Sequence, residues 1–177
     1  LRRPDSEERP ADRRQPLGKI TVGHAVHDGE GTDWVKVYVG GAEHHRARWG
    51  TEGTAGRNPW EPHDTRDVAT RRVVCDLAAG LARDPLNAPV DLDDGRGYRL
   101  RRDGVSPGAR QALADMIETL AMRVARGERI ILLCHCRGGR EALSEANRCH
   151  ADGLCEAIKR RASHLLDSGR AGRGGTV

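Results

Sequence analysis

The stretch from residue 106 to residue 133 constrains the fold more than any other part of the sequence. Ser106 can cap a helix, Pro107 suits its first position, and Gly127 can end it. Apolar residues recur along this helix at three- and four-residue spacing, at Leu113, Met116, Ile117, Leu120 and Val124. The continuous apolar run 130–133 follows after two residues and is typical of a strand buried on both faces. A helix, a tight turn and a buried strand form the second half of a β-α-β unit, so we predict an α/β domain whose mixed or mostly parallel sheet is flanked by helices.

Two segments near the N-terminus alternate between apolar and polar residues in the manner of strands. They are residues 20–26 and 34–39. Residues 27–31 between them, His-Asp-Gly-Glu-Gly, have the composition of a turn. The pattern predicts an N-terminal hairpin.

A further helix and a short strand are expected in the middle of the chain. Asp64 or Thr65 can cap a helix that begins near Arg66. Its apolar residues repeat on one face, at Val73, Val74, Leu77 and Leu81. Residues 98–100 have the character of a short strand.

The length of 177 residues is that of about one domain. Residues 1–16 mix Arg, Asp, Glu and Pro without apolar periodicity, so we expect a flexible arm there. We place the α/β domain at residues 17–167 and a flexible tail at 168–177. Because no apolar run is long enough for a membrane span or a secretory signal, we expect a cytoplasmic protein with no membrane partner.

The net charge of +4 is a property of the C-terminal end. Residues 157–177 carry five cations and one anion, so the first 156 residues sum to zero. This end could contact the phosphates of a nucleic acid. A solvated helix end and tail is the alternative.

Residues 43–60 form a long stretch that we expect to be irregular. Connections of this length are uncommon in compact domains unless they carry function. Several side chains in it could hold an anionic, planar ligand by ion pairing and stacking: His44, His45, Arg46, Arg48 and Trp49. Among these we assign substrate binding to His45 and Arg48, and a mobile surface loop is the alternative.

Cysteines, histidines and glycines gather where the buried strand ends. Open α/β sheets bind ligands at the carboxyl ends of their strands, which is where residues 134–140 begin. The bend at Gly138-Gly139 could present N–H groups to an anion, and Arg137 and Arg140 flank it. We therefore expect these four residues to bind substrate.

The same region supports a reactive-thiol interpretation. Cys149 lies at the start of a predicted helix that continues to Leu165-Leu166, and the positive end of the helix dipole favours a thiolate. Cys149 would be the nucleophile, His150 or His135 the base, and Asp152 an orienting carboxylate.

A metal site is the second interpretation of these residues. Cys134, Cys136, Cys149 and His150 supply a Cys3His set that could bind zinc tetrahedrally. Packing of the thiols without chemistry is a third interpretation. The sequence leaves all three open.

Four short motifs resemble the uncharacterised DUF4326 domain family of bacteria and phages. They are residues 38–40 (Tyr-Val-Gly), 56–60 (Gly-Arg-Asn-Pro-Trp), 133–136 (Leu-Cys-His-Cys) and 149–154 (Cys-His-Ala-Asp-Gly-Leu). The family has the order VYVG, GNPF, LxCWCxP and CHGDxL. The resemblance implies that the turn at Asn58 and the cysteine cluster belong to one site.

Together these features predict a small enzyme that acts, by hydrolysis or group transfer, on a phosphate-bearing and nucleotide-like substrate. Asn58 and Trp60 would wall its pocket. The alternative is a non-catalytic nucleic-acid-binding module that holds a structural zinc ion.

Overall fold

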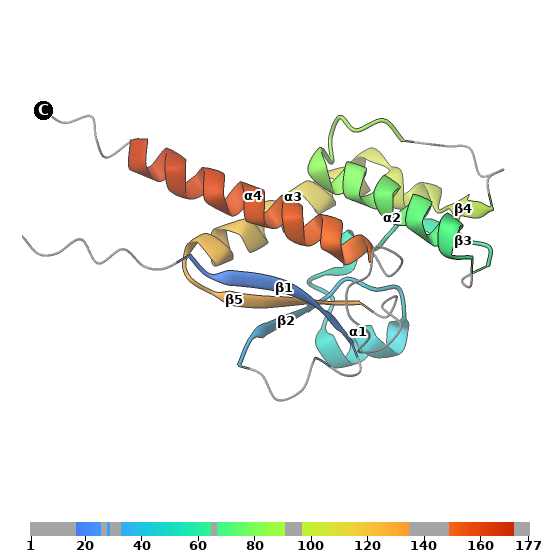
Figure 1. Ribbon diagram of the computed structural model, residues 1–177, viewed down its shortest axis with the longest axis horizontal. Helices are drawn as coiled ribbons and strands as arrows, with labels where there is room; N and C mark the ends of the chain where they lie inside the picture. Colours follow the sequence, from blue (N-terminus) through green and yellow to red (C-terminus); the bar gives the residue numbers. More distant parts are fainter. Residues whose placement is uncertain are drawn as a thin grey trace, which may run out of the picture.

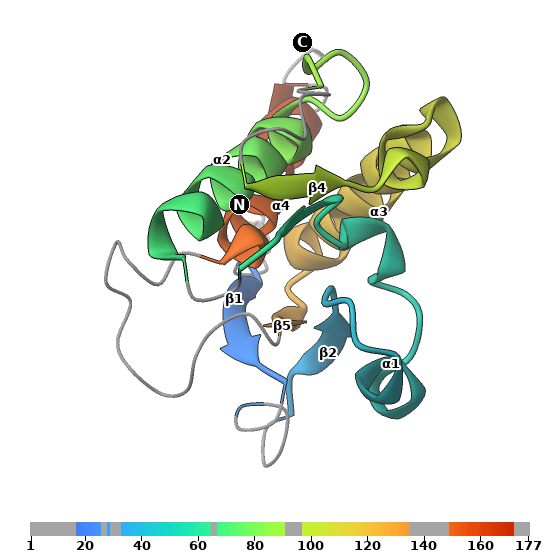
Figure 2. The same ribbon diagram turned by 90° about the vertical axis from the view of Figure 1, so that its right-hand side faces the viewer.

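Figures 1 and 2 show a computed structural model of the protein. It describes residues 17–25, 28, 33–64, 67–90, 97–134 and 149–171. The expected N-terminal arm lies outside these residues, as does the end of the expected tail.

Three parallel strands form the central sheet. β1 (Lys19–His24) and β2 (Val35–Tyr38) each pair with β5 (Arg129–Cys134), which lies between them. The apolar run of β5 thus takes the position in which both strand edges are hydrogen-bonded and both faces are covered. The structure confirms an α/β fold with a parallel sheet.

The predicted N-terminal hairpin is wrong, because β1 and β2 run parallel on opposite sides of β5. The expected turn chemistry is nevertheless present at the end of β1. The N–H of Asp28 donates to the carbonyl of His24 at 2.9 Å, and the N–H of His24 donates to Asp28 Oδ2 at 2.6 Å. Alternation predicts a strand but not its partner, and the more apolar β5 takes the central place.

A second, smaller sheet pairs β3 (Trp60–Pro62) with β4 (Tyr98–Leu100) in antiparallel fashion. The sequence predicted β4 and missed β3. The side chains of Trp60 and Tyr98 are buried in the main core, and Glu61 lies opposite Arg99 in the register.

Helices cover one face of the parallel sheet. α4 (His150–Ala171) packs on β1 and β5 and on its neighbours α3 (Pro107–Ala125) and α2 (Val68–Arg83), as Figure 1 shows. The 3-10 helix η2 (Arg102–Val105) leads into α3. The apolar stripes of these helices share one core with the sheet.

Local capping sets where the helices begin and end. The Oγ of Ser106 accepts a hydrogen bond from the first turn of α3, and Gly127 follows that helix with a φ of 93°, as its predicted bounds required. For α2 the cap is Asp67, not Asp64 or Thr65, because the Asp67 carboxylate accepts from two N–H groups of the first turn.

The other face of the sheet carries a smaller apolar cluster beside α1 (Glu43–Trp49), which lies next to β2 in Figure 2. Its members are Ala25, Tyr38, Ile131 and Leu133, with Trp34 and Trp49 packed against them. The expectation that residues 43–60 are irregular is wrong, since they contain α1, the 3-10 helix η1 (Thr54–Gly56) and the start of β3.

The last helix, α4, extends to Ala171 and so passes residue 167, where we expected the domain to end. None of the helices in the described residues has the length and apolar character needed to cross a membrane.

Candidate metal centre

Three side chains that could bind a metal ion meet at the carboxyl end of β5. They belong to Cys134, the last residue of the strand, to Cys149, and to His150, the first residue of α4. Their sulfur and nitrogen donor atoms all lie within 4.8 Å of one another. The three residues are buried, with exposed fractions of 2%, 2% and 6%. They could hold a metal ion.

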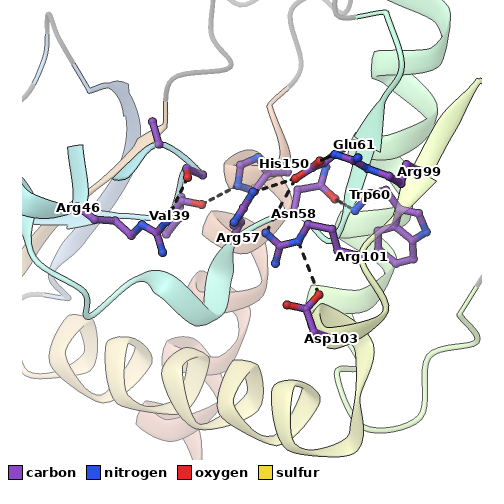
Figure 3. Close-up of polar contacts among 12 residues, drawn as sticks. Val39, Arg46, Arg57, Asn58, Trp60, Glu61, Arg99, Arg101, Asp103 and His150 are labelled. Atoms are coloured by element: carbon purple, nitrogen blue, oxygen red, sulfur yellow. Dashed lines mark hydrogen bonds and ion pairs between the residues drawn. The ribbon is translucent and has the colours of Figure 1, made fainter. Parts of the chain in front are cut away.

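The His150 ring is oriented by a backbone carbonyl. Its Nε2 lies 3.1 Å from the oxygen of Val39, a contact drawn in Figure 3. Because a carbonyl only accepts, Nε2 carries a proton, and in the neutral ring Nδ1 then presents its lone pair. Histidine ligands of metals commonly donate their second nitrogen to a carbonyl in this way.

The lone pair on Nδ1 faces both sulfur atoms. The Nδ1 of His150 lies 3.7 Å from the Sγ of Cys134 and 3.8 Å from the Sγ of Cys149. With zinc bonds of about 2.3 Å to sulfur and about 2.05 Å to nitrogen, a tetrahedral site separates those atoms by about 3.6 Å. These two nitrogen–sulfur distances are therefore close to those of a zinc site. One lone pair can accept a proton fully from only one thiol, whereas a shared metal ion satisfies all three donors.

The sheet brings these residues to one edge. Val39 directly follows β2, and its N–H donates to the carbonyl of Leu133 in β5 at 2.9 Å. The ends of β2 and β5 and the start of α4 therefore surround the same point. This is the edge at which open α/β sheets bind ligands.

The first turn of α4 is fixed by a reciprocal cap. The N–H of Cys149 donates to Oδ2 of Asp152 at 2.9 Å, and the N–H of Ala151 reaches the Sγ of Cys149 at 3.4 Å. This arrangement resembles a capping box in which a cysteine replaces the usual serine or threonine. The hydrogen bond from Cys149 makes Asp152 a helix cap, a role that sequence reasoning did not assign to it.

The two other described cysteines pack in the core and join no disulfide. The thiol of Cys155 donates to the carbonyl of Ile20 at 3.6 Å, and burial raises its pKa despite the nearby charge of Lys159. Cys75 is buried in α2. Neither belongs to the metal centre.

Six predicted site residues lie outside the described residues: His135, Cys136, Arg137, Gly138, Gly139 and Arg140. The structure thus brings together three of the four predicted metal ligands and leaves Cys136 as a prediction.

Asn58 and Trp60 support the small sheet. The Nδ2 of Asn58 donates to the carbonyl of Val74 in α2 at 3.2 Å, and its Oδ1 accepts from the N–H of Trp60 at 3.0 Å. Trp60 is 2% exposed and packs in the main core. These contacts explain both residues by packing, and their place in a pocket wall stays a prediction.

The two residues assigned to a ligand in α1 are less constrained. The guanidinium of Arg48 lies over the ring of Trp49, 4.8 Å from its centroid, on the exposed side of the helix. For His45 the structure describes the backbone but not the side chain. Substrate binding by either residue stays a prediction.

Sequence reasoning missed a group of arginines around Glu61, shown in Figure 3. Arg57 lies 2.8 Å, Arg99 2.6 Å and Arg101 3.9 Å from the Glu61 carboxylate. Burial alone would raise the pKa of Glu61, but the hydrogen bond from Arg99 and the charges of Arg57 and Arg99 hold it below its ordinary value. Only the spacing between Arg57 and Glu61 was a signal in the sequence.

Two cations of the basic C-terminal end are engaged within the fold. Arg161 donates from Nη2 to Glu118 in α3 at 3.0 Å, and Arg160 donates to the carbonyl of Arg83 in α2 at 3.1 Å. Both contacts tie α4 to its neighbouring helices.

Comparison of the chain with protein-family models, with curated proteins and with solved structures finds no match in any of the three. The resemblance to the DUF4326 family stays a prediction.

Proposed function

We propose that the chain is a zinc-dependent enzyme that acts by hydrolysis or group transfer on a phosphate-bearing, nucleotide-like substrate. One observation carries the proposal: the sulfur atoms of Cys134 and Cys149 face the Nδ1 of His150, 3.7 and 3.8 Å away. The position of this cluster at the carboxyl ends of parallel strands supports a substrate site beside it.

The donor set favours zinc over other common metals. Two thiolates and one imidazole suit zinc, whereas magnesium and calcium take oxygen ligands. Zinc bound by two cysteines and one histidine occurs in catalytic sites that keep a fourth position for water.

The identity of the fourth zinc ligand distinguishes a catalytic zinc site from a structural one. In the enzyme proposed here Cys134, Cys149 and His150 would hold the zinc ion, which would leave one position for water and would lower the pKa of that water to about 7. If Cys136 took that position instead, the site would be a closed Cys3His set, which is typical of structural zinc. The alternative of a nucleic-acid-binding module corresponds to this closed site.

Metal analysis of single-cysteine variants tests the proposal. Zinc would be measured by mass spectrometry in protein purified without added metal, and the release of phosphate and base would be assayed on a panel of nucleoside phosphates. We expect about one zinc per chain in the wild type, because all three donors are preformed. Cys149→Ser should lose both zinc and turnover.

Two further variants provide the controls. Cys75→Ala removes a buried cysteine outside the centre and should keep zinc and turnover. Cys136→Ser should keep zinc if water is the fourth ligand. Loss of zinc in Cys136→Ser, with no turnover of any nucleotide by the wild type, would favour the structural site, and metal-free wild-type protein would contradict both functions.

A further inference from the structure

An arginine cluster packs against the loop that follows β2, and Figure 3 draws it beside His150 of the metal centre. A methyl group on Gly41 would lie 2.9 Å from the Nε of Arg57, so the Arg57 side chain packs directly on this loop. Arg46 donates to the carbonyl of Gly41 at 3.4 Å. Gly41 is only two residues past Val39, whose carbonyl holds the ring of His150. The loop therefore contacts both the metal centre and two guanidinium groups.

Arg101 brings a third guanidinium to the cluster. The backbone N–H of Arg101 donates to the carbonyl of Pro59 at 2.8 Å, which places Arg101 beside the segment that carries Arg57. The Nε of Arg101 is buried and has no hydrogen-bond partner among the described residues. The carboxylate of Asp103 lies 3.8 Å from this Nε, outside hydrogen-bond range, and the Asp103 side chain is 82% exposed. A buried donor on a charged group costs free energy when it is unpaired, so a ligand that offers an acceptor to this Nε would bind favourably.

The charges within the cluster are not balanced by Glu61. The Glu61 carboxylate is shared by Arg57, Arg99 and Arg101. Burial lowers the pKa of Arg101 and repulsion from Arg57 adds to the effect, while attraction to Asp103 and Glu61 opposes it and Arg46 adds a smaller repulsion. Guanidinium groups held close enough to repel one another favour an anion between them.

We propose that Arg46, Arg57 and Arg101 bind the phosphate group of a small-molecule ligand. Guanidinium forks match phosphate oxygens in pairs, and a phosphate would both accept from the buried Nε of Arg101 and offset the repulsion. Phosphate binding stands on these contacts alone. Only the further claim that this ligand is the substrate of the adjacent metal centre rests on the proposed function.

Isothermal titration of the full chain at low salt tests the site with three probes: inorganic phosphate, adenosine monophosphate, and adenosine as the control without phosphate. We expect saturable binding of the two phosphate probes and none of adenosine. Arg57→Gln and Arg101→Gln should each weaken phosphate binding about tenfold or more, because each removes a charge-assisted hydrogen-bonding group. Arg101→Lys should recover only part of the loss, since lysine keeps the charge but not the fork.

Two variants separate a phosphate site from a structural ion-pair network. Arg99 also pairs with Glu61 but is 68% exposed, so Arg99→Gln should change phosphate affinity less than about threefold. Glu61→Gln removes the carboxylate that competes for the arginines and should tighten phosphate binding. The inference is overturned if the wild type binds neither phosphate probe, if Arg99→Gln weakens binding as much as Arg57→Gln, or if Glu61→Gln leaves the affinity unchanged or lower.

Zinc analysis distinguishes this inference from the proposed function. Cys149→Ser should lose zinc and still bind phosphate as the wild type does. Phosphate binding by a wild-type protein that has neither zinc nor turnover would support the arginine site and contradict the proposed enzymatic function. Zinc and turnover in a protein that fails to bind phosphate would overturn the arginine site and support the proposed enzyme.

Discussion

The Nε2 of His150 donates to the carbonyl oxygen of Val39 at 3.1 Å, and this bond turns the opposite nitrogen of the ring toward Cys134 and Cys149. The ring belongs to α4, whereas the carbonyl follows β2 and Cys134 ends β5. The centre therefore exists only because neighbouring parallel strands end at the same edge and α4 begins there. The first prediction concerns the His150 ring.

Replacing His150 by glutamine should abolish tight zinc binding. Glutamine has a similar size and can still donate to Val39, but it lacks the ring nitrogen that faces the sulfur atoms. We expect zinc affinity to fall by more than the roughly 10–100-fold seen when only a hydrogen-bond partner of a ligand is removed. Competition with a chromophoric chelator measures it.

His164→Gln is the matched control, because His164 lies on the same helix and is exposed. It should bind zinc as the wild type does. Equal affinity in the His150 and His164 variants would contradict ligation by His150.

Replacing Asp152 by alanine should lower the free energy of unfolding by about 1 kcal/mol, the usual effect of losing a helix cap. The reason is that its carboxylate accepts from the N–H of Cys149 at 2.9 Å. Glu156→Ala, an exposed substitution on the same helix, should stay within about 0.5 kcal/mol of the wild type in urea titrations. If Asp152→Ala kept its stability and lost only turnover, the carboxylate would act in the chemistry instead of the cap.

The sequence predicted the parts of this site that depend on local pattern. β5 and α3 were evident because capping residues, apolar spacing and a two-residue turn lie within one continuous stretch. Cys134, Cys149 and His150 were found because a strand end and a helix start can each be located from sequence. The pairing of β1 and β2 with β5 was not predicted, since a strand shows the same alternation of apolar and polar residues whichever strand it pairs with.

Long-range register explains what the sequence did not reveal about the arginines. Arg99 meets Glu61 only because β4 pairs with β3. The short β3 has no periodicity of its own, so nothing in the sequence placed the two residues opposite each other. Arg101 depends on the same pairing through its hydrogen bond to Pro59.

Two helical glycines should respond oppositely to an added side chain. A methyl group on Gly153 in α4 would lie 2.5 Å from the Cβ of Ala79 in α2, so Gly153→Ala should force the helices apart. We expect destabilisation of about 1–3 kcal/mol, the usual cost of overpacking. Gly80→Ala meets no atom within 4 Å and should stabilise by about 0.5–1 kcal/mol. Thermal unfolding measures both, and a stabilised Gly153→Ala would contradict the close approach of α2 and α4.

The stability of the protein should fall in acid partly through Glu61. The pKa of this carboxyl is held below its ordinary value of 4.5 in the folded protein, where burial is outweighed by Arg99 and Arg57. A lowered pKa means that the unfolded chain binds the proton more readily. The stabilisation is therefore complete above the ordinary pKa and is lost as the pH falls through the folded value.

Urea titrations between about pH 3 and pH 7 test this dependence. Glu61→Gln should lose less stability than the wild type as the pH falls, and Arg99→Gln should lie between them because it removes the strongest hydrogen bond to the carboxylate. Identical slopes for the wild type and Glu61→Gln would show that other carboxyls account for the acid sensitivity.

Removing the proposed zinc ion should destabilise the fold at the junction of β5 and α4, since its three candidate ligands join the strand end to the helix start. A metal that binds only the folded chain stabilises it by about 4 kcal/mol when its free concentration is about a thousand times the dissociation constant. Chelation of the wild type should therefore lower its midpoint of thermal unfolding, and added zinc should restore it. Cys149→Ser should unfold at one temperature whether zinc or chelator is present, because it lacks one of the two sulfur ligands. A wild type that is equally indifferent to zinc would show that Cys134, Cys149 and His150 are a packing cluster, whose donors meet without a metal between them.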